Sequence, residues 1–252
     1  MKDYPYRLTE TILSLVAEIS ENIGRLSVLT AEKADVRLRR INRIRTVYGS
    51  LAIEQNTLEL SEVTAVLDGK RVLAPPKDIA EVKNAFAVYD RLDALDPFSV
   101  EDLLLAHGVM EQGLIEEAGV FRSGNVGVAD AGGRILHFGN LPAYVPGAVE
   151  KLLTWTKESP LPMLLKSCVF HYEFELLHPF ADGNGRMGRL WQTLLLSQWE
   201  PLFQWLPVES IIHDRQAAYY EAINRSNAAG ESTLFLEFML DAIKTALDEI
   251  AL

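Results

Sequence analysis

The segment from His178 to Arg189 carries an imidazole, a carboxylate, glycines and arginines within twelve residues. A histidine is available to take a proton from an attacking hydroxyl group, and general-base catalysis of this kind contributes about 10²–10⁴-fold to a rate. His178 is followed directly by Pro179, which ends the apolar run before it. The imidazole is therefore expected at a turn between two helices.

The residues after this turn predict a site for a polyphosphate. A new helix is expected near Asn184, and the first amide groups of a helix have no acceptor within it. Gly183 and Gly185 leave these amides open to an anion. Arg186 and Arg189 lie three residues apart on one helix face, where each charge-assisted hydrogen bond contributes about 1.5–3 kcal/mol. Asp182 could place a carboxylate oxygen on a Mg²⁺ ion that bridges phosphates.

Other interpretations of this segment are weaker. Gly183 to Gly188 spell G-x-G-x-x-G, but a dinucleotide-binding fold needs a strand before this motif, and the preceding run has helical spacing. The glycines are not followed by Lys-Ser or Lys-Thr, so there is no Walker sequence. Glu175 and His178 form one Glu-x-x-His pair, whereas di-iron bundles use two. A purely structural turn would have no need of two arginines, a carboxylate and an imidazole.

The composition predicts a globular protein of the cytoplasm. The 252 residues are 48% hydrophobic and 23% charged, and the net charge is −11 with a pI near 5.0. This acidic balance disfavours nucleic acid and anionic membranes as partners. Cys168 is the only cysteine, which excludes an intramolecular disulfide and fits a reducing compartment. The N-terminus lacks the apolar run of a signal peptide, and no stretch reaches the ~18 apolar residues of a membrane span.

The periodicity of the apolar residues predicts a mainly α fold with one β-hairpin. Helical spacing covers most of residues 6–54 and, after the pair Pro75–Pro76, most of residues 79–250. The pattern changes between Gly119 and Gly139, where Gly132–Gly133 would make a turn and Ile135–Phe138 a return strand. We therefore expect an N-terminal helical region at residues 1–75 and the main domain at residues 76–252.

The segment resembles the signature of the Fic family, H-x-F-x-[D/E]-G-N-G-R-x-x-R. Every specified position is matched, by His178, Phe180, Asp182, Gly183, Asn184, Gly185, Arg186 and Arg189. The resemblance extends over roughly residues 80 to 245 and includes a Gly-x-Phe-Arg stretch at Gly119–Arg122. It implies a Fic-type helical bundle with a β-hairpin flap and an N-terminal helical extension. It also implies a protein adenylyltransferase, which transfers AMP from ATP, with Mg²⁺, to a Tyr, Thr or Ser hydroxyl of a target protein.

The same resemblance implies a role for each matched residue. His178 would be the general base and Asp182 the Mg²⁺ ligand, while Gly183, Asn184 and Gly185 would form the anion hole. Arg186 and Arg189 would hold the distal phosphates, with Arg189 on the γ-phosphate. Candidates for the adenine pocket are Tyr219, Tyr220 and Asn227, although aromatic pairs on helices are more often core residues. The flap, at Leu136, His137 and Phe138, would bind the target's backbone by strand addition.

Many family members carry an inhibitory helix with the motif S/T-x-x-x-E-G/N. Ser50 and Glu54 match its serine and glutamate and share one helix face, but Gln55 stands where Gly or Asn is usual. By this resemblance Glu54 pairs with Arg189 and excludes the γ-phosphate, so that the resting protein is weakly active. An exposed glutamate with no such role is the simpler alternative.

Two alternative functions remain, a hydrolase of the same fold that removes AMP from its target and a nucleotide-binding module with negligible catalysis. Family members also often associate with themselves, so a homo-oligomer and self-modification are further expectations.

Overall fold

The structure is a computed structural model that describes residues 4–30, 36–129, 135–138 and 141–250. The longer helices are α1 (Glu10–Thr30), α2 (Val36–Ile53), α3 (Leu60–Leu67), α4 (Pro76–Tyr89), α5 (Val100–Met110), α6 (Val145–Glu158), α7 (Met163–Leu177), α8 (Asn184–Trp199), α9 (Val208–Asp214), α10 (Gln216–Ala229) and α11 (Thr233–Ile250). Short 3-10 helices are η1 (Leu92–Ala94), η2 (Pro142–Tyr144) and η3 (Pro201–Gln204). Within these ranges, no helix combines the length and the apolar character that crossing a membrane requires. The predicted mainly α fold is confirmed.

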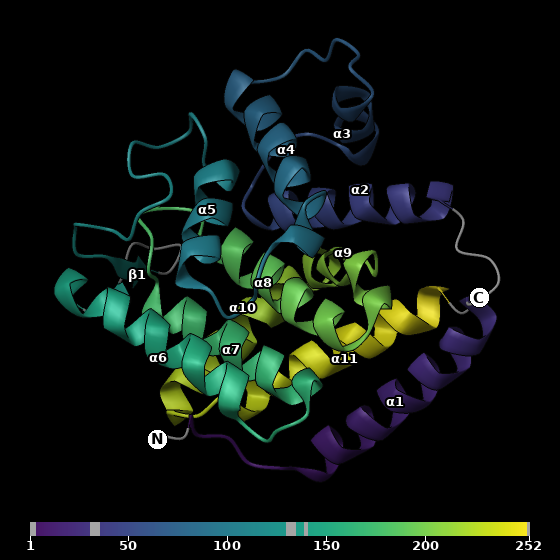
Figure 1. The fold of residues 1–252 in the computed structure, drawn as a ribbon, viewed down its shortest axis with the longest axis vertical. Helices are drawn as coiled ribbons and strands as arrows, with labels where there is room; N and C mark the ends of the chain where they lie inside the picture. The colour runs from purple at the N-terminus through teal and green to yellow at the C-terminus, as the bar shows by residue number, and fades with distance from the viewer. Residues whose placement is uncertain (1–3, 31–35, 130–134, 139–140, 251–252) are drawn as a thin grey trace.

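Helix α8 lies at the centre of the molecule (Figure 1). Its side chains are buried on nearly every face, and Met187, Leu190, Trp191 and Leu194 are all 0% exposed. A helix buried all round must be covered by other helices. Helix α7 packs along α8, and α6 and α11 pack in turn on α7. The signature segment therefore joins α7 to α8. The close packing of these two helices sets its position.

The first three helices pack directly on the rest of the chain. Helix α1 lies along α11, and α2 contacts α9, α4, α3 and α8. Gly49 permits a close approach of α2 to α9, because a Cβ atom there would come within 2.7 Å of the backbone of Glu209 and Ser210. Helix α2 is thereby seated on α9 just before Ser50. The domain division at residue 75 stays a prediction of the sequence.

The described strands form one antiparallel pair, β1 (Gly127–Ala129) and β2 (Ile135–Phe138). Gly127 pairs with Phe138 and Val128 with His137, and the register shifts between Val128 and Ala129. The second strand has the predicted bounds. The predicted turn at Gly132–Gly133 lies outside the described residues, and for Leu136, His137 and Phe138 only the backbone is described.

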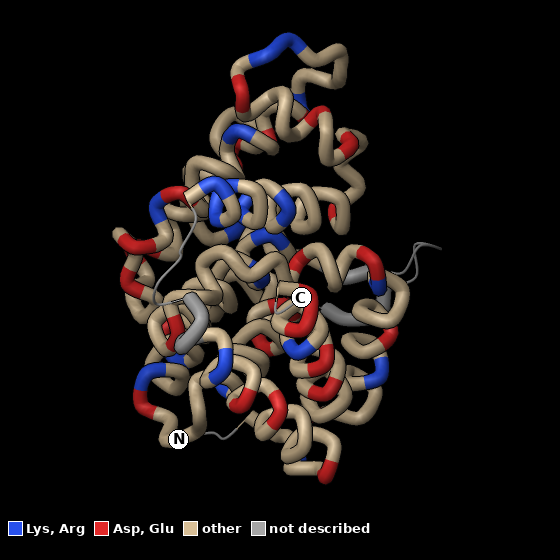
Figure 2. Tube along the Cα trace, turned by 90° about the vertical axis from the view of Figure 1, so that its right-hand side faces the viewer, with Lys and Arg blue, Asp and Glu red and all other residues tan. Residues whose placement is uncertain are grey.

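Charged residues of both signs are spread over the molecule (Figure 2). The arginine-rich stretch of α2 is partly neutralised by ion pairs to other elements: Arg40 with Asp68 at 3.0 Å, Arg43 with Asp90 at 2.7 Å and Arg45 with Glu249 at 3.3 Å. Exposed pairs of this kind contribute little stability individually. They nevertheless give these three arginines carboxylate partners within the chain.

A buried carboxyl group joins three helices near the centre. Glu209 of α9 is 1% exposed, and its Oε1 accepts hydrogen bonds from the hydroxyls of Tyr89 of α4 and Thr193 of α8, both at 3.0 Å. Burial raises the pKa of Glu209 to about 7, because the charged form loses its hydration, although these hydrogen bonds oppose the shift.

This raised pKa predicts a pH dependence of stability. Because the folded-state pKa lies above the ordinary value of 4.5, folding favours the protonated form, and the advantage is lost as the pH rises through about 7. A tenfold difference in acidity between the folded and unfolded states corresponds to about 1.4 kcal/mol, so the loss is of the order of a few kcal/mol. We expect the unfolding free energy of Glu209→Gln, measured in denaturant between about pH 5 and pH 8, to fall less than that of the wild type. Parallel profiles would contradict this assignment.

Candidate functional site

His178 turns the chain sharply out of α7. It follows the last residue of the helix and adopts a left-handed conformation, with φ 48°, which is uncommon for a residue other than glycine. The side chain of Arg122 holds this turn, because its Nε donates to the carbonyl of His178 at 2.7 Å. The backbone amide of Arg122 also donates to the carbonyl of Pro179 at 3.1 Å. The Gly-x-Phe-Arg stretch thus positions the imidazole-bearing turn.

Phe180 and Asn184 hold the loop between α7 and α8. The side-chain amide of Asn184 accepts from the backbone N–H of Phe180 and donates to its carbonyl, both at 2.9 Å. The Phe180 ring is fully buried and stacks on His107 with the ring centroids 3.7 Å apart. Asn184 was predicted only as part of the anion hole, whereas its side chain here shapes the loop.

His107 is a loop-supporting residue that the sequence did not reveal. Its Nδ1 accepts from the backbone N–H of Gly119 at 3.0 Å, so its Nε2 carries the hydrogen and donates to the carbonyl of Asp182 at 3.1 Å. Burial lowers the pKa of His107 to about 4, which keeps the ring neutral. The loop is 75 residues away in sequence, and nothing near His107 indicates that contact.

Two carboxylates lie against the glycines at the start of α8. Gly183 precedes the helix in a left-handed conformation, with φ 78°. A Cβ atom at Gly183 would overlap Oε1 of Glu111, and one at Gly185 would overlap Oε1 of Glu54. The left-handed backbone favours glycine at Gly183, and a side chain at Gly185 would have to displace the carboxylate of Glu54, which lies directly at the predicted anion hole.

Arg186 is buried among carboxylates but keeps hydrogen-bonding capacity. Its side chain is 5% exposed and lies 3.1 Å from Glu111, 3.6 Å from Glu81 and 3.7 Å from Asp182. Its Nε and Nη1 are buried and make no hydrogen bond within the described ranges. Burial raises the pKa of Glu111 to about 7, against the opposing attraction of Arg186. A guanidinium with two unused buried donors is suited to an incoming oxyanion.

Arg189 is brought together with both predicted inhibitory residues. Its side chain is 1% exposed, and Nη2 donates to Oε1 of Glu54 at 2.8 Å and to the carbonyl of Ser50 at 3.0 Å. Its Nε donates to the hydroxyl of Ser50 at 3.2 Å. Burial alone would lower the pKa of Arg189, but the charge of Glu54 is the largest of several opposing effects that raise it.

Asp182 is the accessible carboxylate of the loop. Its side chain is 56% exposed, and its Oδ1 accepts from the backbone N–H of Gly183 at 2.7 Å. The described residues contain no group of three or more His, Cys, Asp or Glu side chains that could hold a metal by themselves. One exposed carboxylate still fits Mg²⁺, which commonly takes one or two protein carboxylates and completes its shell with phosphate oxygens and water.

The predicted adenine-pocket residues of α10 differ in accessibility. Tyr219 is 1% exposed and its hydroxyl lies 3.1 Å from Nε2 of His171, whereas Tyr220 is 42% exposed. Asn227 accepts at Oδ1 from the hydroxyl of Tyr172 at 2.9 Å. Tyr219 is therefore packed in the core, and Tyr220 is the tyrosine of this pair that a ligand could reach without repacking.

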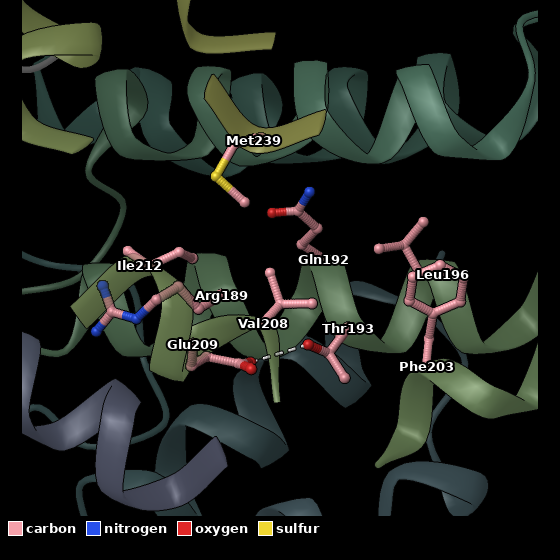
Figure 3. A pocket seen from close by; sticks show the side chains of 9 residues that line it. All are labelled: Arg189, Gln192, Thr193, Leu196, Phe203, Val208, Glu209, Ile212 and Met239. Carbon is pink, nitrogen blue, oxygen red and sulfur yellow. Dashed lines mark hydrogen bonds between the residues drawn. The ribbon is translucent and has the colours of Figure 1, made fainter. Parts of the chain in front are cut away.

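A separate small pocket borders Arg189 (Figure 3). Glu209 and Thr193 are hydrogen-bonded to each other at its edge, and much of the remaining lining is apolar. Its lining residues are Arg189, Gln192, Thr193, Leu196, Phe203, Val208, Glu209, Ile212 and Met239. Because His178, Asp182 and Arg186 do not line it, this pocket is not the predicted phosphate site.

Comparison with known proteins agrees with the signature. A model of the Fic/DOC family matches residues 97–196. Protein adenylyltransferase fic-1 of Caenorhabditis elegans is 29% identical over 95% of this chain and 49% of its own length. Protein adenylyltransferase Fic of Nematostella vectensis is 27% identical over 80% of this chain and 47% of its own length. The chain thus spans about half the length of these curated relatives.

Solved structures extend the similarity to nearly the whole chain. The crystal structure of a Fic family protein from Desulfovibrio desulfuricans G20 is 49% identical and covers 99% of this chain and 77% of that one, with a TM-score of 0.96. A structure of Fic-1 from C. elegans shares the fold at 21% identity, with a TM-score of 0.76 over 96% of this chain and 71% of that one. The signature, the fold and this 49% identity together place the chain in the Fic family.

Proposed function

We propose that this protein is a protein adenylyltransferase, which transfers AMP from MgATP to a Tyr, Thr or Ser hydroxyl of a target protein. The observation that carries the proposal is the buried guanidinium of Arg186 beside the start of α8, whose Nε and Nη1 make no hydrogen bond within the described ranges. The names of the curated relatives support ATP and a protein as the two substrates.

The phosphate site would be built from backbone and guanidinium groups. The backbone amides at Asn184 and Gly185, and that of Gly183 if its bond to Asp182 opens, would bind phosphate oxygens at the positive end of the α8 dipole. Arg186 and Arg189 would hold the distal phosphates. Asp182 would hold Mg²⁺, which would neutralise phosphate charge when bound. Tyr220, and Asn227 if its bond to Tyr172 opens, would contact the adenine, and Tyr219 would support them from the core.

His178 would act on the proton of the target. Its imidazole would take the proton from the hydroxyl as the hydroxyl oxygen bonds to the α-phosphorus of ATP. The bond between the α-phosphorus and the bridging oxygen would break, and pyrophosphate would leave. The target would be presented by β2, because an extended peptide can add to a strand edge through its backbone. Leu136, His137 and Phe138 belong to that strand.

The position of the Glu54 carboxylate supports a role in inhibition. It occupies the space against Gly185 and pairs with Arg189, so it would sit where the γ-phosphate must bind. Arg189 cannot serve two anions in one geometry, and ATP would bind productively only after Glu54 leaves. The 2.8 Å contact argues against the simpler alternative of an unpartnered glutamate. Residues 1–75 would therefore include a regulatory element, carried by α2.

The backbone conformation at Gln55 explains why the inhibitory motif usually has Gly or Asn at this position. Gln55 adopts φ 67°, one of two positive φ angles among the described residues other than glycine. Glycine and asparagine adopt this conformation most easily, which explains why they are usual in the motif. Glutamine at this position stores strain, of the order of 1 kcal/mol. The inhibitory turn of this chain would accordingly be less stable than one with Asn.

The first prediction from the proposed function concerns the general base. In a Glu54→Gly background, His178→Ala should reduce the protein-bound label from α-labelled ATP by about 100-fold or more, because a general base contributes at least that much. Labelling is measured on the protein itself and on a cell lysate with Mg²⁺ present. His213→Ala, which removes another partly exposed imidazole, is the matched control and should keep its labelling.

The outcomes of this experiment separate the alternatives. Label from γ-labelled ATP would instead indicate phosphate transfer, and no label in any Glu54 variant would favour a nucleotide-binding module. A hydrolase would release AMP from a previously labelled target, and this release would need Glu54. Equal α-labelling with and without His178 would refute the proposed chemistry.

The second prediction concerns inhibition. Glu54→Gly should raise the initial rate of labelling by about tenfold, since an ion pair with one partly exposed partner contributes about 1 kcal/mol or somewhat more. Glu54→Gln, which keeps the shape but removes the charge, should raise the rate less. If both variants label at the wild-type rate in a protein that depends on His178, Glu54 is not inhibitory.

The third prediction tests the strain at Gln55. Gln55→Asn should lower the wild-type labelling rate by about two- to fivefold, because strain of about 0.5–1 kcal/mol is removed from the inhibited state alone. In the Glu54→Gly background the same substitution should leave the rate unchanged. A lower rate in both backgrounds would show that residue 55 acts on the enzyme by another route.

A further inference from the structure

The turn that carries Glu54 is seated on the first turns of α4. The side-chain amide of Asn56 donates to Oε2 of Glu81 at 2.8 Å and to the carbonyl of Asp78 at 3.2 Å. The backbone N–H of Thr57 donates to Oδ2 of Asp78 at 3.1 Å, and the Thr57 hydroxyl donates to the same oxygen. The inhibitory turn thus has two anchors on α4, one through Glu81 and one through Asp78.

The Glu81 anchor also lies close to a signature arginine. Glu81 is 8% exposed, and its Oε1 lies 3.6 Å from Nη1 of Arg186, one of the two guanidinium donors without a hydrogen bond. Lys77 is the other cation near this oxygen, at 3.7 Å. A single buried carboxylate therefore contacts the inhibitory turn through one oxygen and the phosphate-binding arginine through the other.

A phosphate at Arg186 would disturb this arrangement. It would compete with Glu81 for Nη1 and bring negative charge close to the Glu81 carboxylate, where both are shielded from water. The repulsion would weaken the position in which Glu81 accepts from Asn56. Because coupling between two sites is reciprocal, seating of the turn on Glu81 must weaken anion binding at Arg186 by the same factor.

We propose that Glu81 is a positioning residue that couples anion binding at Arg186 to the seating of the Glu54 turn. The inference rests on the proposed function, because it takes Arg186 as a phosphate-binding residue. A nucleotide that reaches Arg186 without a γ-phosphate would loosen the inhibitory turn without competing for Arg189. The inhibitory segment is then linked to both signature arginines, to Arg189 by direct contact and to Arg186 through Glu81.

The test uses MgADP, which lacks the γ-phosphate, and amide hydrogen exchange on the full chain. The amides of Glu54, Gln55 and Asn56 donate to Leu51 and Ala52, and thus report the turn. Saturating MgADP should accelerate their exchange by roughly fivefold or more in the wild type, the lower end of typical coupling. Calorimetry on the same samples measures ADP binding.

Three variants distinguish coupling through Glu81 from a general destabilisation of the inhibitory turn. Glu81→Gln keeps an acceptor for Asn56 but loses the charge, whereas Asn56→Ala removes the hydrogen bond to Glu81 together with those to Asp78 and Leu58. ADP should bind to both variants without accelerating exchange. Thr57→Val, the matched control, removes only a bond to Asp78, so its exchange should be faster from the start and still respond to ADP.

Bound ADP without faster exchange in the wild type would overturn the coupling alone and leave the phosphate site standing. An unchanged response in Glu81→Gln and Asn56→Ala would also overturn it. If ADP does not bind to the wild type, both the coupling and the proposed phosphate site fail.

Discussion

The buried guanidinium of Arg189 has room for only one anion where Glu54 now binds, and the proposed regulation depends on that constraint. Arg189 belongs to α8, the best-covered helix of the fold, so the arginine cannot follow a departing partner without disrupting the core. Its present partners come from α2 and the turn after it. Helix α2 is held against α9 at backbone contact by Gly49. If Glu54 and Arg189 separate, the turn with Glu54 is therefore the part that would move, and not either helix.

The chemistry proposed for the loop depends on a second constraint, the reversal of the chain between α7 and α8. Left-handed residues at His178 and Gly183 make the reversal, and Arg122, Asn184 and His107 hold it from three sides. These contacts use the backbone of the loop and leave the Asp182 carboxylate accessible. Rigid support behind exposed reactive groups is what group transfer requires, because the reacting atoms must be aligned before the reaction begins.

The local features of this site could be predicted from the sequence, whereas its distant partners could not. The helix start at Asn184, the strand Ile135–Phe138 and the pairing of Glu54 with Arg189 follow from spacing, turn chemistry and family resemblance. Glu81, Glu111 and His107 were missed, because each lies on another helix or at its end and is brought to the loop by tertiary packing alone. An acidic side chain on an amphipathic helix has the same sequence pattern whether it faces water or a buried arginine.

The exposure of Tyr219 and Tyr220 could not be predicted from the sequence either. Tyr219 and its neighbour Tyr220 have the same residue type and the same role predicted from the sequence, yet Tyr219 is 1% and Tyr220 42% exposed. Tyr219 packs against His171 of α7 and against Phe235 and Phe238 of α11, and these contacts depend on the packing of the bundle.

The competition at Arg189 is tested most directly by comparing the affinities of MgATP and MgADP, by calorimetry, in the wild type and in Glu54→Gly. We expect the variant to gain at least roughly tenfold more affinity for ATP than for ADP, since only ATP carries the γ-phosphate that Glu54 would exclude. A variant that leaves the ratio of the two affinities unchanged would contradict the claim that Glu54 and the γ-phosphate compete for one guanidinium.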